Sequence, residues 1–209
     1  MMTTLQAAKQ YTAAGLSIIP IRAKDKRPSI KSWQPYQERL PAEIEILRWF
    51  KSECNIAILG GPISGGLLII DFDHQAEEIF PAWRAMLTEK LGGLVETLPI
   101  VKTGKGYHVY TRCADDPGGN QKLARDAENV LIETRGAGGY VLAPPSIHPS
   151  GAAYQLIAGD LAKIPVLNKE QHQALIDCCT FFDAQPDEPP AAPAPAPVVL
   201  AGDRPQLPN

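Results

Sequence analysis

The sequence of 209 residues lacks several features that mark other classes of protein. It has no run of about 18 apolar residues, so no membrane-spanning helix is expected. Its first residues show no basic region followed by an apolar stretch, so no secretory signal is predicted and the cytoplasm is the expected location. Its four cysteines form no Cys-x-x-Cys pair and stand at no zinc-finger spacing from a histidine, which argues against structural zinc.

The chain also has little net charge for a protein that would bind nucleic acid. The formal charge is -3, and residues 183–209 account for all of it with four acids and one base. Residues 1–182 are therefore formally neutral. A neutral domain that gathers carboxylates around a metal can still present a basic groove, but charge alone predicts no strong free-standing DNA binder.

Hydrophobic periodicity predicts helices and strands that mix without a regular βαβ repeat, which favours the α+β class. Helices are expected at residues 4–14, 41–51, 79–91 and 169–182. Strands are expected at residues 16–21, 55–59, 67–70, 97–102, 107–111, 130–134 and 140–143, with another near Tyr154. In the second helix, the side chains expected to be buried are Ile44, Leu47 and either Trp49 or Phe50.

The end of the chain differs in composition from the rest. Residues 183–209 are rich in proline and alanine, which favours an extended segment that cannot bury a core. We therefore expect one catalytic domain at residues 1–182 and a disordered linker toward a further domain from residue 183. The cysteines, which are Cys54, Cys113, Cys178 and Cys179, are expected to be reduced core or surface residues.

The strongest chemical signal is a pair of aspartates at the end of an apolar run. Asp71 and Asp73 follow residues 67–70, and Phe72 separates them. Because residues two apart in a strand point to the same side, both carboxylates should share one face while Phe72 faces the other. Carboxylate oxygens favour Mg²⁺ or Mn²⁺. The alternative is that Asp73 caps the following helix and Asp71 is an exposed strand end.

A second signal is a glycine-rich turn that leads into a strand. Gly104, Lys105, Gly106 and His108 could together hold a triphosphate through backbone N–H groups, one ammonium and one imidazole. This is no Walker A loop, because Gly-Lys-Ser/Thr opening a helix is absent. A hairpin turn beside a half-buried core histidine explains the same residues nearly as well.

A third signal is an acid that ends another apolar strand. Glu133 is followed by Arg135 and then by a glycine turn into a second strand. Glu133 could supply the third carboxylate of a two-metal site. The alternative is a glutamate on an edge strand beside a glycine-rich hairpin.

The loop at residues 22–39 is basic, with six Lys or Arg residues against two acids. Lys26 and Arg27 could follow template phosphates, with Trp33 stacking on a base. A solvated loop anchored by a buried Trp33 is an equally good interpretation.

In this order and with these flanks, the segments resemble the bifunctional DNA primase/polymerase domain of the archaeo-eukaryotic primase superfamily, found in plasmid and phage replication proteins. The resemblance covers about residues 5–182. The residues that carry it are Lys26, Pro28, Trp33, Asn55, Asp71, Asp73, His108, Glu133, Arg135, Pro144, Pro145, Ser146, His148 and Tyr154. Two positions depart from the family pattern: Gly106 stands where a small hydroxyl residue is usual, and Glu133 where aspartate is frequent.

The resemblance implies an RRM-like mixed sheet with helices, joined to a smaller N-terminal α/β subdomain that shares its core. It implies a DNA primase and DNA polymerase in which Asp71, Asp73 and Glu133 hold two Mg²⁺ or Mn²⁺ ions. It further implies that His108 contacts a phosphate of the incoming dNTP or NTP. The other nucleotide contacts expected are Gly104, Lys105, Gly106, Arg135, Ser146 and His148. The implied partners are a single-stranded DNA template and a primer, with a helicase as a common neighbour.

Two other classes remain open at the level of the sequence. A metal-dependent nuclease or rolling-circle replication initiator could use a similar sheet, but such enzymes need a His-x-His metal pair, and His108 has no second histidine two residues away. A non-catalytic module that binds single-stranded nucleic acid is the third interpretation.

Overall fold

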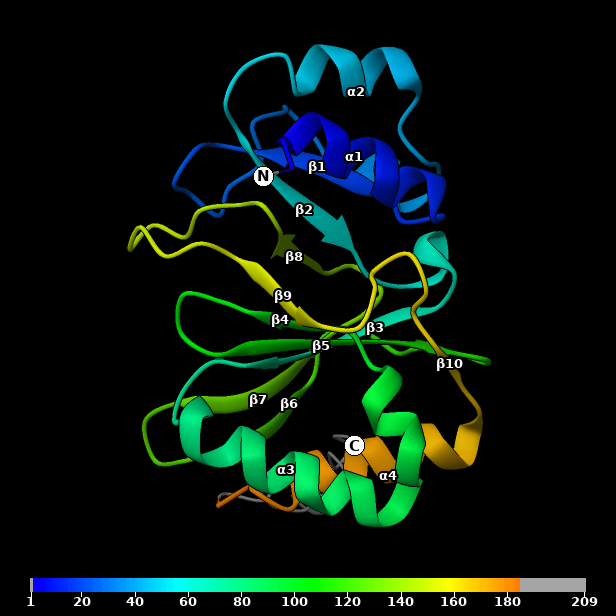
Figure 1. Ribbon diagram of the computed structural model, residues 1–209, viewed down its shortest axis with the longest axis vertical. Helices are drawn as coiled ribbons and strands as arrows, with labels where there is room; N and C mark the ends of the chain where they lie inside the picture. The colour runs from blue at the N-terminus through cyan, green and yellow to red at the C-terminus, as the bar shows by residue number, and fades with distance from the viewer. Residues whose placement is uncertain (1, 185–209) are drawn as a thin grey trace, which may run out of the picture.

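Two sheets organise the computed structural model, which describes residues 2–184 (Figure 1). The N-terminal elements are α1 (Thr4–Ala13), β1 (Ile18–Ile21), α2 (Glu43–Trp49) and β2 (Asn55–Leu59). The elements that follow are β3 (Leu67–Phe72), α3 (Ala76–Leu91), β4 (Ile100–Lys102), β5 (Tyr107–Cys113), β6 (Lys122–Arg125), β7 (Val130–Arg135), β8 (Tyr140–Ala143), β9 (Gln155–Ala158), β10 (Val166–Leu167) and α4 (Lys169–Thr180). Short 3-10 helices occur at Gln34–Gln37, Pro62–Ser64 and Gly92–Thr97.

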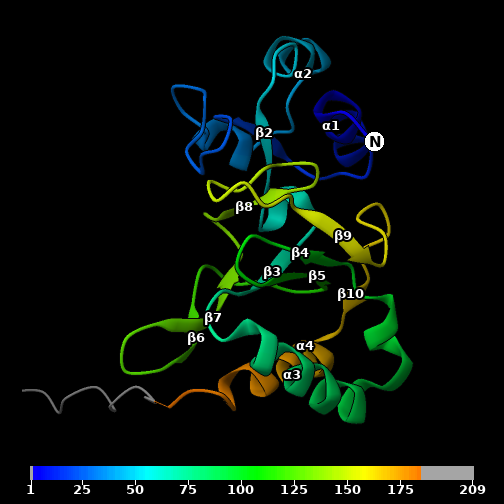
Figure 2. The same ribbon diagram turned by 60° about the vertical axis from the view of Figure 1, so that its left-hand side comes forward.

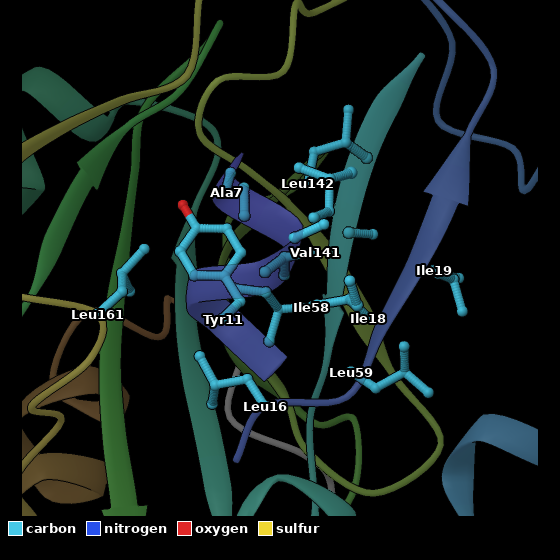
Figure 3. Close-up of a cluster of buried hydrophobic side chains, with 14 of the residues drawn as sticks. Ala7, Tyr11, Leu16, Ile18, Ile19, Ile58, Leu59, Val141, Leu142 and Leu161 are labelled. Atoms are coloured by element: carbon cyan, nitrogen blue, oxygen red, sulfur yellow. The ribbon is translucent and has the colours of Figure 1, made fainter. Parts of the chain in front are cut away.

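The smaller sheet has the antiparallel order β1-β2-β8. Every residue of β1 and β2 is buried. A strand that is covered on both faces reads as a continuous apolar run, as the sequences IIPI and NIAIL do. Side chains from α1, β1, β2 and β8 pack together in one cluster, with Tyr11 of α1 at its centre (Figure 3). The expected N-terminal α/β subdomain is therefore present.

The larger sheet has the order β6-β7-β3-β5-β4-β9. Strands β3 and β4 both run antiparallel to β5, which lies between them, and α3 connects them in a split β-α-β arrangement. With β7 on the other side of β3, this is the strand order expected for an RRM-like sheet. The pairing of β10 with β5 is parallel and makes the sheet mixed. The α+β class is confirmed.

The sheet departs from a regular split β-α-β pattern in its second half. Strand β6, rather than a helix, precedes β7 in the chain. The second covering helix comes from α4, which lies beside α3 on the same face of the sheet (Figure 2). Strands β6 and β10 were not predicted, because KLAR has no β-branched residue and β10 has only two residues.

Alternation along β3 assigns its two faces. Leu68, Ile70 and Phe72 pack in the cluster that contains α3 and α4. Leu67 and Ile69 pack in the cluster shared with the smaller sheet. The next residue on that second face is Asp71, so its side chain lies on the side of the smaller sheet.

The expected burial in α2 was wrong for two residues. Ile44 is 73% exposed and Leu47 is 40% exposed, whereas Ile46 and Phe50 are buried. Trp49 is partly buried and packs against the same cluster. The helix begins at Glu43, and its inward face follows the spacing i, i+3, i+4 from Ile46.

Other boundaries also differ from the expectations. The strand expected at residues 97–102 is shorter, because the chain after α3 continues as the 3-10 helix up to Thr97. At the other end, Asp183 and Ala184, assigned to the linker, bond to the backbone of Arg125. The rest of the expected linker, residues 185–209, lies outside the described residues.

Two further expectations concern cysteines and membrane helices. All four cysteines are free thiols, as expected. Within residues 2–184, none of the helices combines the length and the apolar character needed to cross a membrane.

Glycines allow the chain to pass between the two sheets. The connection from β2 to β3 contains Gly60, whose N–H donates to the carbonyl of Gly139 in the turn from β7 to β8 at 3.0 Å. A Cβ at Gly60 would lie 2.5 Å from the carbonyl oxygen of Gly136. A Cβ at Gly136 would overlap the carbonyl of Gly118. These backbones approach so closely that only glycine fits, and their contact sets the position of one sheet against the other.

We expect Gly136→Ala to lower the free energy of unfolding by about 2 kcal/mol, because the added methyl group forces the backbone of Gly118 away. Urea denaturation measures the change. Gly93→Ala is the matched control, since nothing lies within 4 Å of an added Cβ there. Equal stability of the two variants would contradict the close packing of the junction.

Candidate functional site

The predicted acids and histidine form one row across three neighbouring strands. Asp71 of β3 pairs in register with Glu133 of β7 on one side and with His108 of β5 on the other. Directly opposite residues of antiparallel strands share a face, so all three side chains lie on the side of the smaller sheet. Strand β7 lies between β6 and β3, so the interpretation of Glu133 as an edge-strand residue was wrong.

Asp73 follows the end of β3 and completes the group. It lies two residues beyond Asp71, and its backbone N–H donates to Leu131 of β7 at 3.2 Å. The N-cap of α3 is Gln75, and no side chain caps this helix. Asp73 therefore does not cap this helix.

The row opens into a cleft of about 290 Å³ between the two sheets. The larger sheet contributes Asp71, His108 and Arg135 to its lining. Tyr140 comes from the smaller sheet, and Lys26 comes from the basic loop. Asp71 thus shares the lining of the cleft with the cations Lys26 and Arg135.

Each carboxylate of the group has a cation or an imidazole beside it. His108 Nε2 lies 3.4 Å from Asp71 Oδ1, and Lys105 Nζ lies 3.7 Å from Asp73 Oδ2. Glu133 forms an ion pair with Arg135. Without such partners, carboxylates this close on one face would repel one another.

The pKa values of two acids move in opposite directions. Burial raises the pKa of Glu133 above its usual value, and the charges of Asp71 and Asp73 add to this against the opposing effect of Arg135. Burial also acts to raise the pKa of Asp71, but His108, Arg135 and Lys26 outweigh it and hold that pKa below its usual value. The acids therefore lie within electrostatic reach of one another.

The chemistry of this donor set fits a hard divalent cation. Three carboxylates on one face offer only oxygen atoms, which Mg²⁺ and Mn²⁺ prefer over nitrogen or sulfur. Within residues 2–184, however, no group of three or more His, Cys, Asp or Glu side chains already converges as metal ligands do. Each acid contacts its own basic or imidazole partner instead. The identity and placement of the residues fit a cation, although the side chains are not preassembled around one.

The turn before β5 depends on its two glycines for packing. The hydroxyl of Thr103 accepts from the N–H groups of Lys105 at 3.2 Å and Gly106 at 2.9 Å. A Cβ at Gly106 would overlap the carbonyl of Phe72 at the end of β3, and a Cβ at Gly104 would overlap the ring of His148. The N–H of Gly106, expected to contact phosphate, is thus already bonded within the turn.

Ser146 and His148 were both expected to contact the nucleotide, but the two residues lie in different surroundings. Ser146 is 2% exposed, and its hydroxyl bonds both the N–H and the carbonyl of Ile56 at 2.9 Å. That hydroxyl therefore joins the chain after β8 to β2 and does not reach the cleft.

The ring of His148 lies over the turn that contains Gly104. Its Nδ1 accepts from the backbone N–H of Ser150 at 3.1 Å, so the neutral ring carries its proton on Nε2. Burial lowers the pKa of His148, and the charges of Lys26 and Lys105 lower it further. His148 is therefore a neutral hydrogen-bond donor.

The basic loop separates its two candidate template residues. Arg27 forms an exposed pair with Asp25 at 2.7 Å. Lys26 instead lines the cleft, where the hydroxyl of Tyr140 donates to its carbonyl at 3.2 Å. Trp33 packs edge-on against Tyr140, with 5.3 Å between ring centroids, which favours the anchored-loop interpretation.

Sequence reasoning missed two residues that support the site. The hydroxyl of Tyr110 lies 3.5 Å from His108 Nδ1, and its position two residues further along β5 could have indicated this contact. Asn120 also lines the cleft. Its side-chain oxygen accepts from the N–H of Gly136 at 3.3 Å, and its side-chain nitrogen donates to the carbonyl of Gly138 at 3.4 Å. No sequence signal pointed to Asn120.

A family profile described as "Bifunctional DNA primase/polymerase, N-terminal" matches residues 8–170. The match runs from α1 to the start of α4 and includes the acids, His108 and all the cleft residues named above. No curated protein matches the sequence.

Proposed function

The chain belongs to the bifunctional DNA primase/polymerase family, and from this premise we propose that it transfers nucleotides from dNTPs or NTPs onto a primer or a first nucleotide, directed by a single-stranded DNA template. The observation that carries the proposal is the row of Asp71, His108 and Glu133 on one face of the sheet, beside a cleft that Asp71 and His108 line together with Lys26 and Arg135. A polyphosphate that carries divalent cations needs carboxylates for its metals and cations for its own charge.

The metal site would be formed by Asp71, Asp73 and Glu133. When bound, two Mg²⁺ or Mn²⁺ ions would lower the pKa of an attacking 3′-hydroxyl and neutralise charge on the triphosphate and the leaving pyrophosphate. Asp71 is suited to this role because its lowered pKa keeps it ionised at neutral pH. A cation beside Glu133 would favour its ionised form, against the burial that raises its pKa.

The remaining residues would bind and orient the nucleotide. His108 has Tyr110 beside its Nδ1 and Asp71 beside its Nε2. Once metal ions take over Asp71, the Nε2 of His108 would contact a phosphate oxygen. Lys105 and Arg135 would provide positive charge at the same end of the cleft.

Cation binding can be tested without any reaction. We expect Mn²⁺ or Mg²⁺ to raise the melting temperature of the protein, because a ligand at 100 times its Kd stabilises the folded state by about 2.7 kcal/mol. The variant Asp71→Asn/Asp73→Asn should lose most of this shift in a thermal scan. Asp115→Asn, which removes an exposed acid elsewhere, should retain it. The same shift in all three proteins would remove the aspartates from the metal site.

Polymerase activity is tested by incubating the protein with a single-stranded template, labelled dNTPs or NTPs and Mn²⁺, with and without a primer. We expect elongated products from the parental protein and none from Asp71→Asn/Asp73→Asn, because the variant cannot hold the metals. Extension by the double variant at the parental rate would refute the site. Cleavage of the template would indicate a nuclease, and binding alone would indicate a non-catalytic module.

Lys26 and Arg27 form a matched pair for testing the basic loop. Because Lys26 lines the cleft and Arg27 is paired at the surface, we expect Lys26→Ala to weaken dATP binding and Arg27→Ala to leave it unchanged. Neither variant should change the salt dependence of single-strand binding. If both residues follow template phosphates, each variant should instead reduce the slope of log K against log salt by about 0.7.

A further inference from the structure

Tyr154 is a buried tyrosine whose hydroxyl has no hydrogen-bond partner among residues 2–184. It is 4% exposed and lines the cleft. The hydroxyls of the other five tyrosines each have a partner: Pro144 for Tyr11, Glu45 for Tyr36, Glu77 for Tyr107, His108 for Tyr110 and Lys26 for Tyr140. Among the tyrosines of residues 2–184, Tyr154 is therefore the one whose hydroxyl is left available to a molecule bound in the cleft.

The hydroxyl of Tyr154 faces the cleft rather than the core. Its oxygen is not fully enclosed by protein atoms, and Tyr154 lines the cleft, so the cleft gives access to the hydroxyl. Burial raises the pKa of Tyr154 well above its usual value, and Asp71 and Asp73 raise it further. The hydroxyl therefore lies within reach of the acids and stays protonated, which makes it a hydrogen-bond donor.

The position of the ring is fixed by its surroundings. The backbone N–H of Tyr154 donates to Ser146 at 2.9 Å, next to a bridge between Ile147 and Ala153. Its ring lies 5.8 Å from the ring of His108 and 6.2 Å from the ring of His148, measured between centroids. Tyr154 thus stands between the two imidazoles expected to meet phosphate.

We propose that Tyr154 contacts the substrate directly, by donating a hydrogen bond from its hydroxyl to a polyphosphate oxygen of the bound nucleotide. The assignment rests on the proposed function. Phosphate oxygens only accept hydrogen bonds, and here the phenol offers a donor that no protein group uses. The cations Lys26, Lys105 and Arg135 around the acids favour the polyphosphate over the base or sugar at this end of the cleft.

The test is Tyr154→Phe, which removes the hydroxyl and keeps the ring. Titration calorimetry with dATP and with dAMP, both in the presence of Mg²⁺, gives the affinities. Because a hydrogen bond to a charged group is involved, we expect dATP to bind roughly tenfold more weakly to the variant and dAMP to change little. The melting temperature of the free variant should stay the same, since the hydroxyl has no partner to lose.

Tyr11→Phe is the matched control, because Tyr11 is also buried but its hydroxyl donates to Pro144 at 2.8 Å within the core. This variant should lose stability and keep its affinity for dATP. Unchanged dATP affinity in Tyr154→Phe would overturn the assignment, as would an equal loss for dATP and dAMP. A parental protein that binds no dATP would instead refute the proposed function itself.

Discussion

Two half-buried carboxylates directly opposite each other on adjacent strands are the constraint around which the rest of the molecule is arranged. Asp71 and Glu133 occupy such a pair, and like charges at directly opposite positions destabilise a sheet. The fold compensates with His108 beside Asp71 and Arg135 beside Glu133, and Lys26 reaches the same cleft from the basic loop. These partners offset the repulsion within the sheet. Under the proposed function, bound divalent cations would offset it further.

The second sheet turns this row of charges into a cleft. Strand β8 follows β7 in the chain but pairs with β2, so the segment after Glu133 leaves the larger sheet and forms the opposite wall. The chain can pass from one sheet to the other because the backbones at Gly60 and Gly136 carry no side chain and approach closely. Ser146 ties the chain after β8 to β2 within the smaller sheet through its bonds to Ile56. The glycines thus fix the relation between the two sheets, and the serine fixes the wall that the smaller sheet provides.

Local patterns predicted the parts of this site, whereas its assembly depends on contacts between distant segments. Alternation along β3 was enough to place Asp71 and Asp73 on one side and Phe72 on the other. The meeting of Asp71 with His108 and Glu133 depends on strand register across 37 and 62 residues of sequence, which no local pattern specifies. The resemblance to a family supplied that grouping in advance.

The departures from expectation have the same physical origin. The resemblance implied a nucleotide contact for Ser146, yet its hydroxyl bonds Ile56, on a strand 90 residues away in the sequence. In α2, Ile44 and Leu47 looked buried because they are apolar, but a seven-residue helix has one inward face, and Ile46 occupies it. Which face turns inward is decided by tertiary packing rather than by composition.

The neutrality of the folded part is consistent with a site that exchanges its ion pairs. In the free protein, Asp73 is near Lys105 and Glu133 is paired with Arg135, so these two cations are engaged by acids. Under the proposed function, divalent cations would take over the carboxylates and leave Lys105 and Arg135 available to phosphate. Each ligand would then favour the binding of the other, because coupling between two sites is reciprocal. A domain without excess positive charge could in this way bind a highly charged nucleotide most strongly together with its metals.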